Sequence, residues 1–549
     1  MWPQALLAAL PLLIVLVLML GLRWPAVRAG GAGLLLTLLV AWFGFGYGTR
    51  VLTELGVAGA TGGALAEALF IAATILWIVF PALCIHELQL RTGAVDVLRM
   101  AMGRLSGDPR ITALLVAWFF VLFVEGAAGF GTSVALAAPF LVSAGFRRVH
   151  AVSIALVGHT VGVSFGAVGT PILAQVAVTP YSGLELAGAT AAYHGLAGWL
   201  MPLVTMLLVT RALPREQRLG GSAWGWTLLA AVAFLLPYVL IAQFIGPELP
   251  TLAGSLIGAA VFIAALLLAR RFGVAKESGR SAKGTGRSAK EAARSAKEAG
   301  RTTPPSSGAR QQRKSHRAGH ETRGRALVRA AAPYLVLVTL VLLTRLLPAV
   351  REALQAVTIA WEGDPFGASF EPLYHPGTML LLGFAAGAAW QRAALADIGA
   401  AMGTAASRLV PVTLALVAML GLARLMVHAG MVDVLASAAA QSAGAAWPLL
   451  APLVGLLGTF VTGSATTSNV LFTDFQVATA ERLELPVLAL LGAQGFGAAV
   501  GNIVCPHNVI AAGATVNLTG REGEVLRRTL GVALAYGLLG GVLALLVFT

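Results

Sequence analysis

The first stretch with residue types suited to chemistry is FVEGAAGFGTSVALAAPF, which begins at Phe123. Glu125 is the only formally charged residue between Ile111 and Phe146. A carboxylate inside an apolar segment is energetically costly, so a function is expected for it. Because burial disfavours the charged form of a carboxyl group, Glu125 suits a proton carrier. The alternative is that Glu125 caps the local backbone or pairs with a fixed donor.

Three glycines follow this glutamate closely, at Gly126, Gly129 and Gly131. Glycine lets the chain turn tightly and lets a ligand approach the backbone. The next two residues, Thr132 and Ser133, carry hydroxyl groups that could donate hydrogen bonds. We therefore expect a helix to break here and to present groups that bind a ligand.

Further polar residues gather at three other places in the apolar sequence. Free helix N-termini carry unsatisfied N–H groups and about half a positive charge, so they can hold a carboxylate without a lysine. Small hydroxyl and amide side chains there would add hydrogen bonds. The remaining candidates for binding a small anion at such breaks are Thr170, Ser464, Thr466, Thr467, Ser468, Asn469, Asn502, His507 and Asn508.

Other polar positions have more than one interpretation. His159, in GHTVGVSFG, could relay protons or bind substrate, but it is equally suited to satisfied packing in a core. Arg424, which precedes His428 in GLARLMVHAG, could bind a substrate carboxylate or lie at the external edge of a membrane. The string IHELQL at His86 lacks the second histidine of a zinc-protease motif, so neither a metal site nor another cofactor is predicted.

These residues lie in a chain with the composition of a membrane protein. Of its 549 residues, 58 % are hydrophobic and 11 % are charged, and the mean hydropathy is +0.82. Uncharged apolar runs of about 18 to 25 residues recur, as expected for helices that cross a hydrocarbon layer about 30 Å thick. We predict an all-α polytopic membrane protein with about 11–13 spans. Its two cysteines, Cys84 and Cys505, lie in apolar segments and provide no disulfide framework.

Two segments are predicted to enter and leave the membrane on the same side. Residues 111–146 would measure roughly 54 Å as a helix, which is too long for one span and short for two. Arginines flank both of its ends, so both ends are predicted to be cytoplasmic. We expect re-entrant hairpins at about 111–146 and about 447–480, with both ends of the second hairpin external.

The hairpins belong to a predicted internal repeat. FVEGAAGFGTSVA from Phe123 is similar to FVTGSATTSNVLF from Phe460, and AVGTPILA from Ala167 is similar to AVGNIVCPHNVIAA from Ala499. Entry from opposite faces implies an inverted-topology repeat, as in many secondary transporters. Chance similarity between short glycine-rich strings is the alternative. The predicted domains are a first transmembrane half at 1–269 and a second at 327–549.

A basic segment at 270–326 separates the two halves. Residues 270–329 contain 17 Lys or Arg and four Glu, which gives +13 of the net charge of +14. We expect a disordered cytoplasmic linker, with binding to anionic lipid headgroups as the alternative. The positive-inside rule then places both chain termini outside the cytoplasm, in the inner membrane of a bacterium. Nucleic acid is not an expected partner, because the basic residues are confined to one loop.

Several strings resemble those of the L-lactate permease family in the same order. They are EGAAGFGTSVA, FGAVGTPIL, FIGPELPTLAGSL from Phe244, TGSATTSNVLF and the segment after Gly501. The resemblance covers most of the chain except the basic segment. It implies proton symport of small 2-hydroxy monocarboxylates, L-lactate with glycolate or D-lactate, by a member of the wider ion transporter superfamily. Glu125 with its glycines, and Ser464 to Asn469, are the site positions that it carries over.

Two departures from the family pattern bear on this prediction. Relatives have an aspartate where this chain has Ala465, and a lysine where it has Asn502. If these charges pair in relatives, losing both is electrically balanced, but if they bind substrate or proton, the preferred anion or the coupling would differ. Na⁺ coupling is therefore an alternative, since hairpin carbonyls and hydroxyls can bind a hard cation. An intramembrane hydrolase using Ser468 or Cys505 is disfavoured, because no candidate base has an orienting acid nearby in the sequence.

Overall fold

The computed structural model describes residues 2–22, 24–103, 106, 108–129, 131–213, 222–271, 323–518 and 521–548. Within these ranges, eleven helices are long and apolar enough to span a membrane, or up to thirteen if each of two bent helix pairs is one span. The prediction of an all-α polytopic protein with about 11–13 spans is confirmed. The predicted basic linker at 270–326 lies almost entirely outside the described residues.

The first half of the chain forms two groups of helices. The first group is α1 (Trp2–Leu20), α2 (Ala26–Leu39), α3 (Gly56–Arg91) and the short α4 (Ala94–Gly103). The second is α5 (Pro109–Leu114), the π-helix η3 (Leu115–Phe120), α6 (Val121–Ala128), α7 (Thr132–Ser143), α8 (Arg148–Val163), α9 (Gly166–Val176), α10 (Gly183–Ala197), α11 (Leu200–Ala212), α13 (Ser222–Phe244) and α14 (Pro250–Arg271).

The second half begins with elements that pack on the first group. These are α17 (Arg323–Leu346), α18 (Pro348–Gln355), the antiparallel strands β1 (Ile359–Gly363) and β2 (Phe366–Phe370), α19 (Pro376–Trp390), α20 (Leu395–His428) and α21 (Met431–Ala443). The remaining helices are α22 (Trp447–Thr462), α23 (Ala465–Arg482), α24 (Val487–Gly501), α25 (Pro506–Thr515) and α26 (Glu522–Leu543). The small β-hairpin was not predicted from the sequence.

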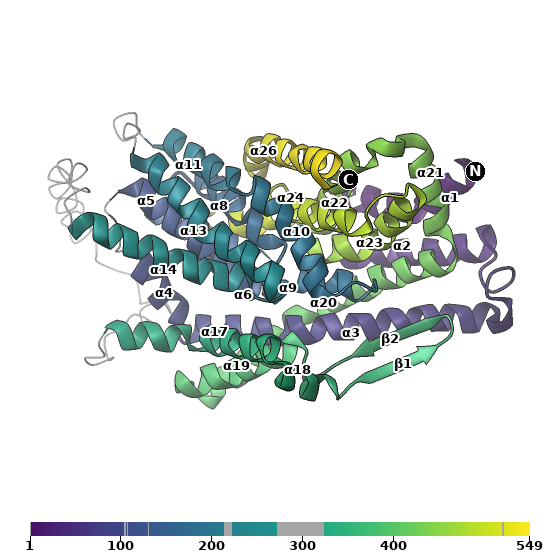
Figure 1. Cartoon of the computed structure of the whole chain (residues 1–549), viewed down its shortest axis with the longest axis horizontal. Coiled ribbons are helices and arrows are strands. Elements are labelled where there is room, and N and C mark those ends of the chain that lie inside the picture. Colours follow the sequence, from purple (N-terminus) through teal and green to yellow (C-terminus); the bar gives the residue numbers. More distant parts are fainter. Residues whose placement is uncertain are drawn as a thin grey trace, which may run out of the picture.

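The helices divide into arm helices and core helices. We call α1–α3 and α17–α21 the arm helices, because α3 packs along α19 and α20 while α17 packs on α19. In Figure 1, α3, α17 and α19 run along one long side of the molecule, and α11, α8 and α26 lie on the opposite side. We call α5–α14 and α22–α26 the core helices; among them α22 packs on α24 and α13 on α14.

Two helix–break–helix hairpins lie within the core. Hairpin 1 consists of α5, η3, α6 and α7, and hairpin 2 consists of α22 and α23. Their helices span 109–143 and 447–482, close to the predicted hairpins at 111–146 and 447–480. The first limb of hairpin 1 is almost fully buried among other helices. That burial allows irregular backbone at its tip, since such backbone is tolerated in a membrane only against protein or water.

An interrupted helix follows each hairpin along the chain. The axes of α8 and α9 bend by 48° after hairpin 1, and the chain breaks between α24 and α25 after hairpin 2. This recurring order is what the predicted repeat requires. Opposite entry into the membrane and the boundaries of the two halves stay predictions. A second bend of 46°, between α10 and α11, was not predicted.

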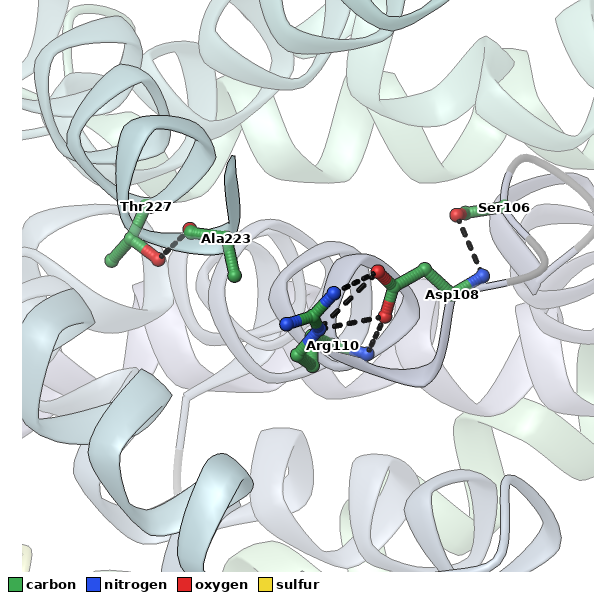
Figure 2. Close-up of polar contacts among 5 residues, drawn as sticks. All are labelled: Ser106, Asp108, Arg110, Ala223 and Thr227. Atoms are coloured by element: carbon green, nitrogen blue, oxygen red, sulfur yellow. Dashed lines mark hydrogen bonds and ion pairs between the residues drawn. The ribbon is translucent and has the colours of Figure 1, made fainter. Parts of the chain in front are cut away.

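Two charged residues close in sequence, Asp108 and Arg110, pair at the start of hairpin 1. Asp108 caps α5 by accepting a hydrogen bond from the Arg110 backbone N–H at 2.8 Å, and its carboxylate also pairs with the Arg110 guanidinium at 2.8 Å. Figure 2 shows this pair, with Ser106 accepting a bond from the Asp108 backbone and with Thr227 of α13 donating to Ala223. Local pairing thus satisfies a charged residue that is largely buried at the entry to an apolar hairpin.

Candidate functional site

The tip of hairpin 1 ends α6 and begins α7 within three residues. Gly129 and Gly131 have φ of +57° and +74°, which an L side chain rarely adopts. Gly131 is the N-cap of α7 and has no side chain, so no side chain caps the free N–H groups of that helix. The Thr132 hydroxyl donates to the Gly129 carbonyl at 2.7 Å. The tip therefore presents an uncapped helix N-terminus, as the glycines predicted.

The tip of hairpin 2 also turns at a glycine, but it is one residue shorter and its second helix is capped. Gly463 has a φ of +79° and ends α22. Ser464 is the N-cap of α23, and its hydroxyl accepts a hydrogen bond from the Thr467 backbone N–H at 3.2 Å. The Thr462 hydroxyl bonds to the carbonyls of Gly458 and Ser464. One donor of α23 is consequently satisfied, in contrast to α7.

The interrupted helices provide two more breaks. In α9, Ala167, Val168 and Gly169 all have positive φ, and the Thr170 hydroxyl donates to the Ala167 carbonyl at 2.5 Å. Ala167 and Val168 are adjacent non-glycine residues with positive φ, so the backbone is strained here. Proteins concentrate such strain at functional sites. At the other break, no side-chain bond caps α25, whose first residue is a proline.

The first turn of α25 lies between the two hairpin tips. A methyl group built on Gly131 would lie 2.5 Å from Asn508 Oδ1, and one built on Gly463 would lie 3.3 Å from His507 Cβ. Asn508 also donates to Asn502 Oδ1 at 2.5 Å, across the α24–α25 break. The N-termini of α7, α23 and α25 therefore meet in one region, although about 330 or more residues of sequence separate α7 from the other two.

The α8–α9 break joins the same region. A methyl group on Gly129 would lie 3.0 Å from Ala167 Cβ. From hairpin 2, Asn469 donates to the Pro171 carbonyl at 2.8 Å. All four predicted breaks thus contribute to one polar region inside an apolar core, which we call the break site.

Glu125 lies on the last turn of α6 and is buried. Its Oε2 accepts a hydrogen bond from the Ser133 hydroxyl at 2.6 Å, so it has the fixed donor that the alternative interpretation proposed. A methyl group on Gly166 would lie 2.6 Å from Oε1, and one on Gly126 would lie 2.6 Å from the Leu252 backbone nitrogen. Within the described ranges, no basic side chain forms an ion pair with this carboxyl.

Several predicted hydroxyl and amide residues have structural partners. Ser468 donates to the Gly455 carbonyl at 2.8 Å and accepts from Gln494. Thr466 is buried, whereas Thr467 is partly exposed on the first turn of α23. His507 is exposed at the start of α25. Thr467 and His507 are therefore the more accessible candidates on their helices.

His159 lies on α8, before the break. It is fully buried, and its Nδ1 lies 2.7 Å from the Leu156 carbonyl. Its Nε2 has no hydrogen-bond partner among the described residues. An unsatisfied buried nitrogen of this kind is unusual for a histidine that serves packing alone. Both interpretations of His159 remain predictions.

Arg424 is placed away from the hairpin tips. It forms a buried ion pair with Asp474 of α23 and lies 4.0 Å from Glu67 of α3. His428 Nε2 lies 2.6 Å from Glu67 Oε2. Arg424 is 5 % exposed within the protein, and its alternative place at the external edge of a membrane also stays a prediction. Its predicted binding to a substrate carboxylate stays a prediction, now with two protein carboxylates beside it.

Sequence reasoning missed both acids of this cluster. Glu67 is the only formally charged residue between Gly56 and Ile85, and Asp474 is the only one between Val434 and Ala480. The criterion that singled out Glu125 would therefore have found both. Also missed was His194, whose Nε2 lies 2.9 Å from the Ser164 hydroxyl at the α8–α9 break and whose Nδ1 lies 3.2 Å from the Tyr536 hydroxyl.

The two positions that depart from the family pattern are near neighbours. Ala465 packs in a small buried cluster with Val163, Ala498 and Ala499. Asn502 lies one helical turn after Ala498. Both positions therefore border the break site.

With this geometry established, comparison with known proteins decides the family. The family profile described as L-lactate permease matches residues 4–366 and 354–549, which is nearly the whole chain. The chain belongs to the L-lactate permease family. Members of this family are transporters, and this protein is therefore a multi-pass membrane transporter rather than an enzyme.

Characterised relatives align over most of their length. An L-lactate permease of Streptococcus iniae is 27 % identical over 488 residues, covering 88 % of this chain and 92 % of the relative. The glycolate permease GlcA and an L-lactate permease of Escherichia coli K12 are each 27 % identical, and each covers 99 % of this chain. The structure of Neisseria gonorrhoeae MtrF covers 95 % of this chain with a TM-score of 0.49 and 12 % identity, a similarity that bears on neither substrate nor mechanism.

Proposed function

We propose that this protein imports small 2-hydroxy monocarboxylates by proton symport across the bacterial inner membrane. L-lactate is the first candidate substrate, with glycolate and D-lactate next, since the relatives are named L-lactate and glycolate permeases. The observation that carries the proposal is the break site, where the first turn of α25 lies between the tips of both hairpins.

The carboxylate of the substrate would bind at the helix N-termini. No side-chain hydrogen bond caps α7 or α25. The Thr132 N–H donates to the Gly129 carbonyl and Pro506 has no N–H, so the N–H groups of Ser133 and His507, next in each first turn, would bond to the anion. The two N-termini lie side by side, because Gly131 of α7 adjoins Asn508 of α25 while Arg148, after α7, bonds to Asn517, after α25. Together they supply partial positive charge without a full positive charge that would hold the anion too tightly. This arrangement suits a carrier, which must release its substrate as readily as it binds it.

The hydroxyl group of the substrate would bond to polar side chains next to these termini. Thr132 follows Gly131 directly, Thr467 lies on the first turn of α23, and Asn508 lies on the first turn of α25. Hydroxyl and amide groups can both donate and accept, so they fit the 2-hydroxyl group of lactate or glycolate. An acid without that hydroxyl would leave these groups unpaired and should bind less tightly.

Glu125 is the proposed proton site. With no basic partner among the described residues, a charged Glu125 would be an uncompensated buried anion, and protonation removes that cost. A substrate carboxylate in the adjoining break site would repel a charged Glu125 strongly in this apolar interior. Anion and proton would therefore favour binding together, which is the physical requirement for symport. His159, with its unpaired Nε2, is the second candidate.

Uptake into proteoliposomes of known internal volume tests this function. Radiolabelled L-lactate should accumulate when the outside is more acidic than the inside, with equal rates in sodium and potassium buffers. Excess glycolate or D-lactate should inhibit the uptake more than propionate, which lacks the hydroxyl group. Accumulation that needs a sodium gradient and ignores the pH gradient would replace the proton with Na⁺ bound by the hairpin carbonyls and hydroxyls.

The proposed orientation places the basic linker in the cytoplasm and both termini outside. The charge of +13 within residues 270–329 supports it through the positive-inside rule. In the same proposal, residues 1–269 and 327–549 form two inverted halves, and the linker joins them, with binding to anionic lipid headgroups as its alternative role. A C-terminal fusion to an enzyme that folds only outside the cytoplasm should be active, whereas an inactive fusion would reverse the orientation.

A further inference from the structure

The structure contains a second buried ionisable site, distinct from Glu125. We call it the charge cluster, and it consists of Glu67, Arg424, His428 and Asp474. Arg424 pairs with Asp474 and lies 4.0 Å from Glu67 Oε1, and His428 Nε2 lies 2.6 Å from Glu67 Oε2. The exposed fractions of the four side chains lie between 7 % and 16 %.

The charge cluster joins an arm to a hairpin. Glu67 lies on α3 and both basic residues lie on α20, which are long arm helices packed along each other. Asp474 lies on α23, the second limb of hairpin 2, about nine residues beyond its first residue. The Arg424–Asp474 pair therefore crosses from the arm helices to the hairpin whose tip forms part of the break site.

Its charges balance only if the cluster holds a proton. Arginine is always charged, so Arg424 contributes one positive charge against the two carboxylates of Glu67 and Asp474. With His428 neutral and both acids ionised, the cluster would carry a net charge of −1 in an almost water-free place. One proton, on His428 or on either acid, restores neutrality, and the short contact from His428 to Glu67 is suited to share it.

Neighbouring groups do not supply the missing charge. The Tyr47 hydroxyl, near Glu67, donates to the Ala60 carbonyl at 2.8 Å. The Phe366 ring of β2 packs edge-on against His428 with 4.7 Å between ring centroids. On the adjoining α21, Asp433 pairs at 3.6 Å with Arg482 of α23, and both of these side chains are exposed. The neighbours described in the structure are thus aromatic or already paired.

We propose that the charge cluster binds one proton and that this proton holds hairpin 2 against α3 and α20. Loss of the proton leaves one uncompensated negative charge at the interface, and Glu67 and Asp474 then repel each other across it. Release of hairpin 2 relieves that repulsion. Protonation would in this way control the position of one side of the break site, independently of the proton on Glu125.

Single substitutions distinguish this proposal from simple structural pairing. In Asp474→Asn, Arg424 and Glu67 balance each other, so the cluster is neutral without any proton. In Glu67→Gln, on arm helix α3, Arg424 and Asp474 balance each other in the same way, and this variant replaces the first if Asp474→Asn does not fold. Asp433→Asn removes an exposed acid from the same region and is the matched control. The proposal expects pH sensitivity to vanish in the first two variants and to persist in the control.

Distances between spin labels on α20 and α23 provide the test, without any substrate. The labels are placed on Leu414→Cys and Glu481→Cys, which are exposed positions, in a protein whose two native cysteines are buried. Between acidic and alkaline buffer, the wild-type distance distribution should shift or broaden, and the Asp433→Asn distribution should do the same. The distributions of Asp474→Asn and Glu67→Gln should not change with pH.

Two results would overturn the proposal. They are a wild-type distribution that does not respond to pH, and a response in Asp474→Asn and Glu67→Gln equal to that of the wild type. Because this measurement uses no transport substrate, a failure of L-lactate uptake would count against the proposed function alone.

Discussion

Both hairpins turn at glycines with positive φ, but they place their carboxylates differently. In hairpin 1, Glu125 lies at the tip and bonds to Ser133 of the same hairpin. In hairpin 2, the tip has Thr462 and Ala465 but no acid, and the carboxylate of Asp474 lies farther along α23, paired with Arg424 of an arm helix. A glycine turn recurs in both hairpins, whereas an acid at the tip does not.

The turn at each tip and the position of each acid serve different purposes. A tip needs glycine to turn, and both tips have it, so the convergence of helix ends depends on backbone geometry common to the two. The charge at tip 1 faces the break site and can respond to what binds there. By contrast, Asp474 of hairpin 2 lies farther along α23 and pairs with Arg424 of an arm helix, so its charge acts on the contact between hairpin 2 and the arm helices. We therefore expect substitutions at the two sites to impair different properties of the protein, transport for Glu125 and stability for the pair of Asp474 with Arg424.

The largest effect on transport is expected for Glu125→Gln. The amide can still accept from Ser133 but cannot bind and release a proton, so a pH gradient should no longer drive lactate accumulation above the level reached without a gradient. Exchange of labelled for unlabelled lactate at equal pH should survive. Glu54→Gln, at an exposed glutamate before α3, is the control. Normal accumulation in the Glu125 variant would remove this residue from the coupling mechanism.

Arg424→Ala should instead act mainly on stability. It leaves Asp474 and Glu67 buried without their arginine, and breaking a buried ion pair in this way costs about 3–5 kcal/mol. Thermal unfolding of the purified protein should show a clear loss. Arg482→Ala, which removes an exposed partner of Asp433, should cost about 0–1 kcal/mol. A stable Arg424 variant with a raised half-saturating lactate concentration would favour the substrate-binding interpretation instead.

The glycines of the two tips should differ in sensitivity. Alanine at Gly131 or Gly463 must adopt a left-handed conformation at about 1–2 kcal/mol in either case. At position 131 the added methyl group would also overlap Asn508, whereas at 463 its nearest neighbour is at 3.3 Å. Lactate uptake should therefore fall further in Gly131→Ala than in Gly463→Ala. Equal losses would show that the packing of tip 1 on α25 does not matter for transport.

The smallest effect is expected for Ser133→Ala. It removes the hydroxyl group that donates to Glu125. The loss of one such hydrogen bond is worth about 1 kcal/mol, or roughly a fivefold change in the affinity of Glu125 for its proton. Its visible result should be a shifted pH dependence of lactate uptake. Thr462→Ala removes a hydroxyl at the other tip that bonds only to backbone, and should leave the pH dependence unchanged. A pH profile shared by Ser133→Ala and the wild type would contradict the link between Ser133 and the proton site.

Local features of the sequence predicted the breaks, but not the long-range pairs. Glycines and small polar residues in apolar runs mark positions where a helix cannot continue, so both hairpins and both interrupted helices were predictable. Arg424 was recognised as a candidate for binding a substrate carboxylate, yet its partners lie on helices 50 and 357 residues away in sequence. The sequence next to a charged residue does not show whether that residue binds a substrate or pairs with a residue of another helix. The bend between α10 and α11 was missed because a single glycine, Gly198, gives little signal.

The central claim is that one substrate contacts both hairpin tips at the break site. Single cysteines at Thr132 and Thr467, which are partly exposed on the first turns of α7 and α23, test it directly in a protein whose native Cys84 and Cys505 are replaced by serine. The rate of labelling by a small thiol reagent is measured with and without saturating L-lactate. The account predicts that L-lactate slows labelling at both positions and that propionate protects less. Labelling that L-lactate leaves unchanged at either position would contradict it.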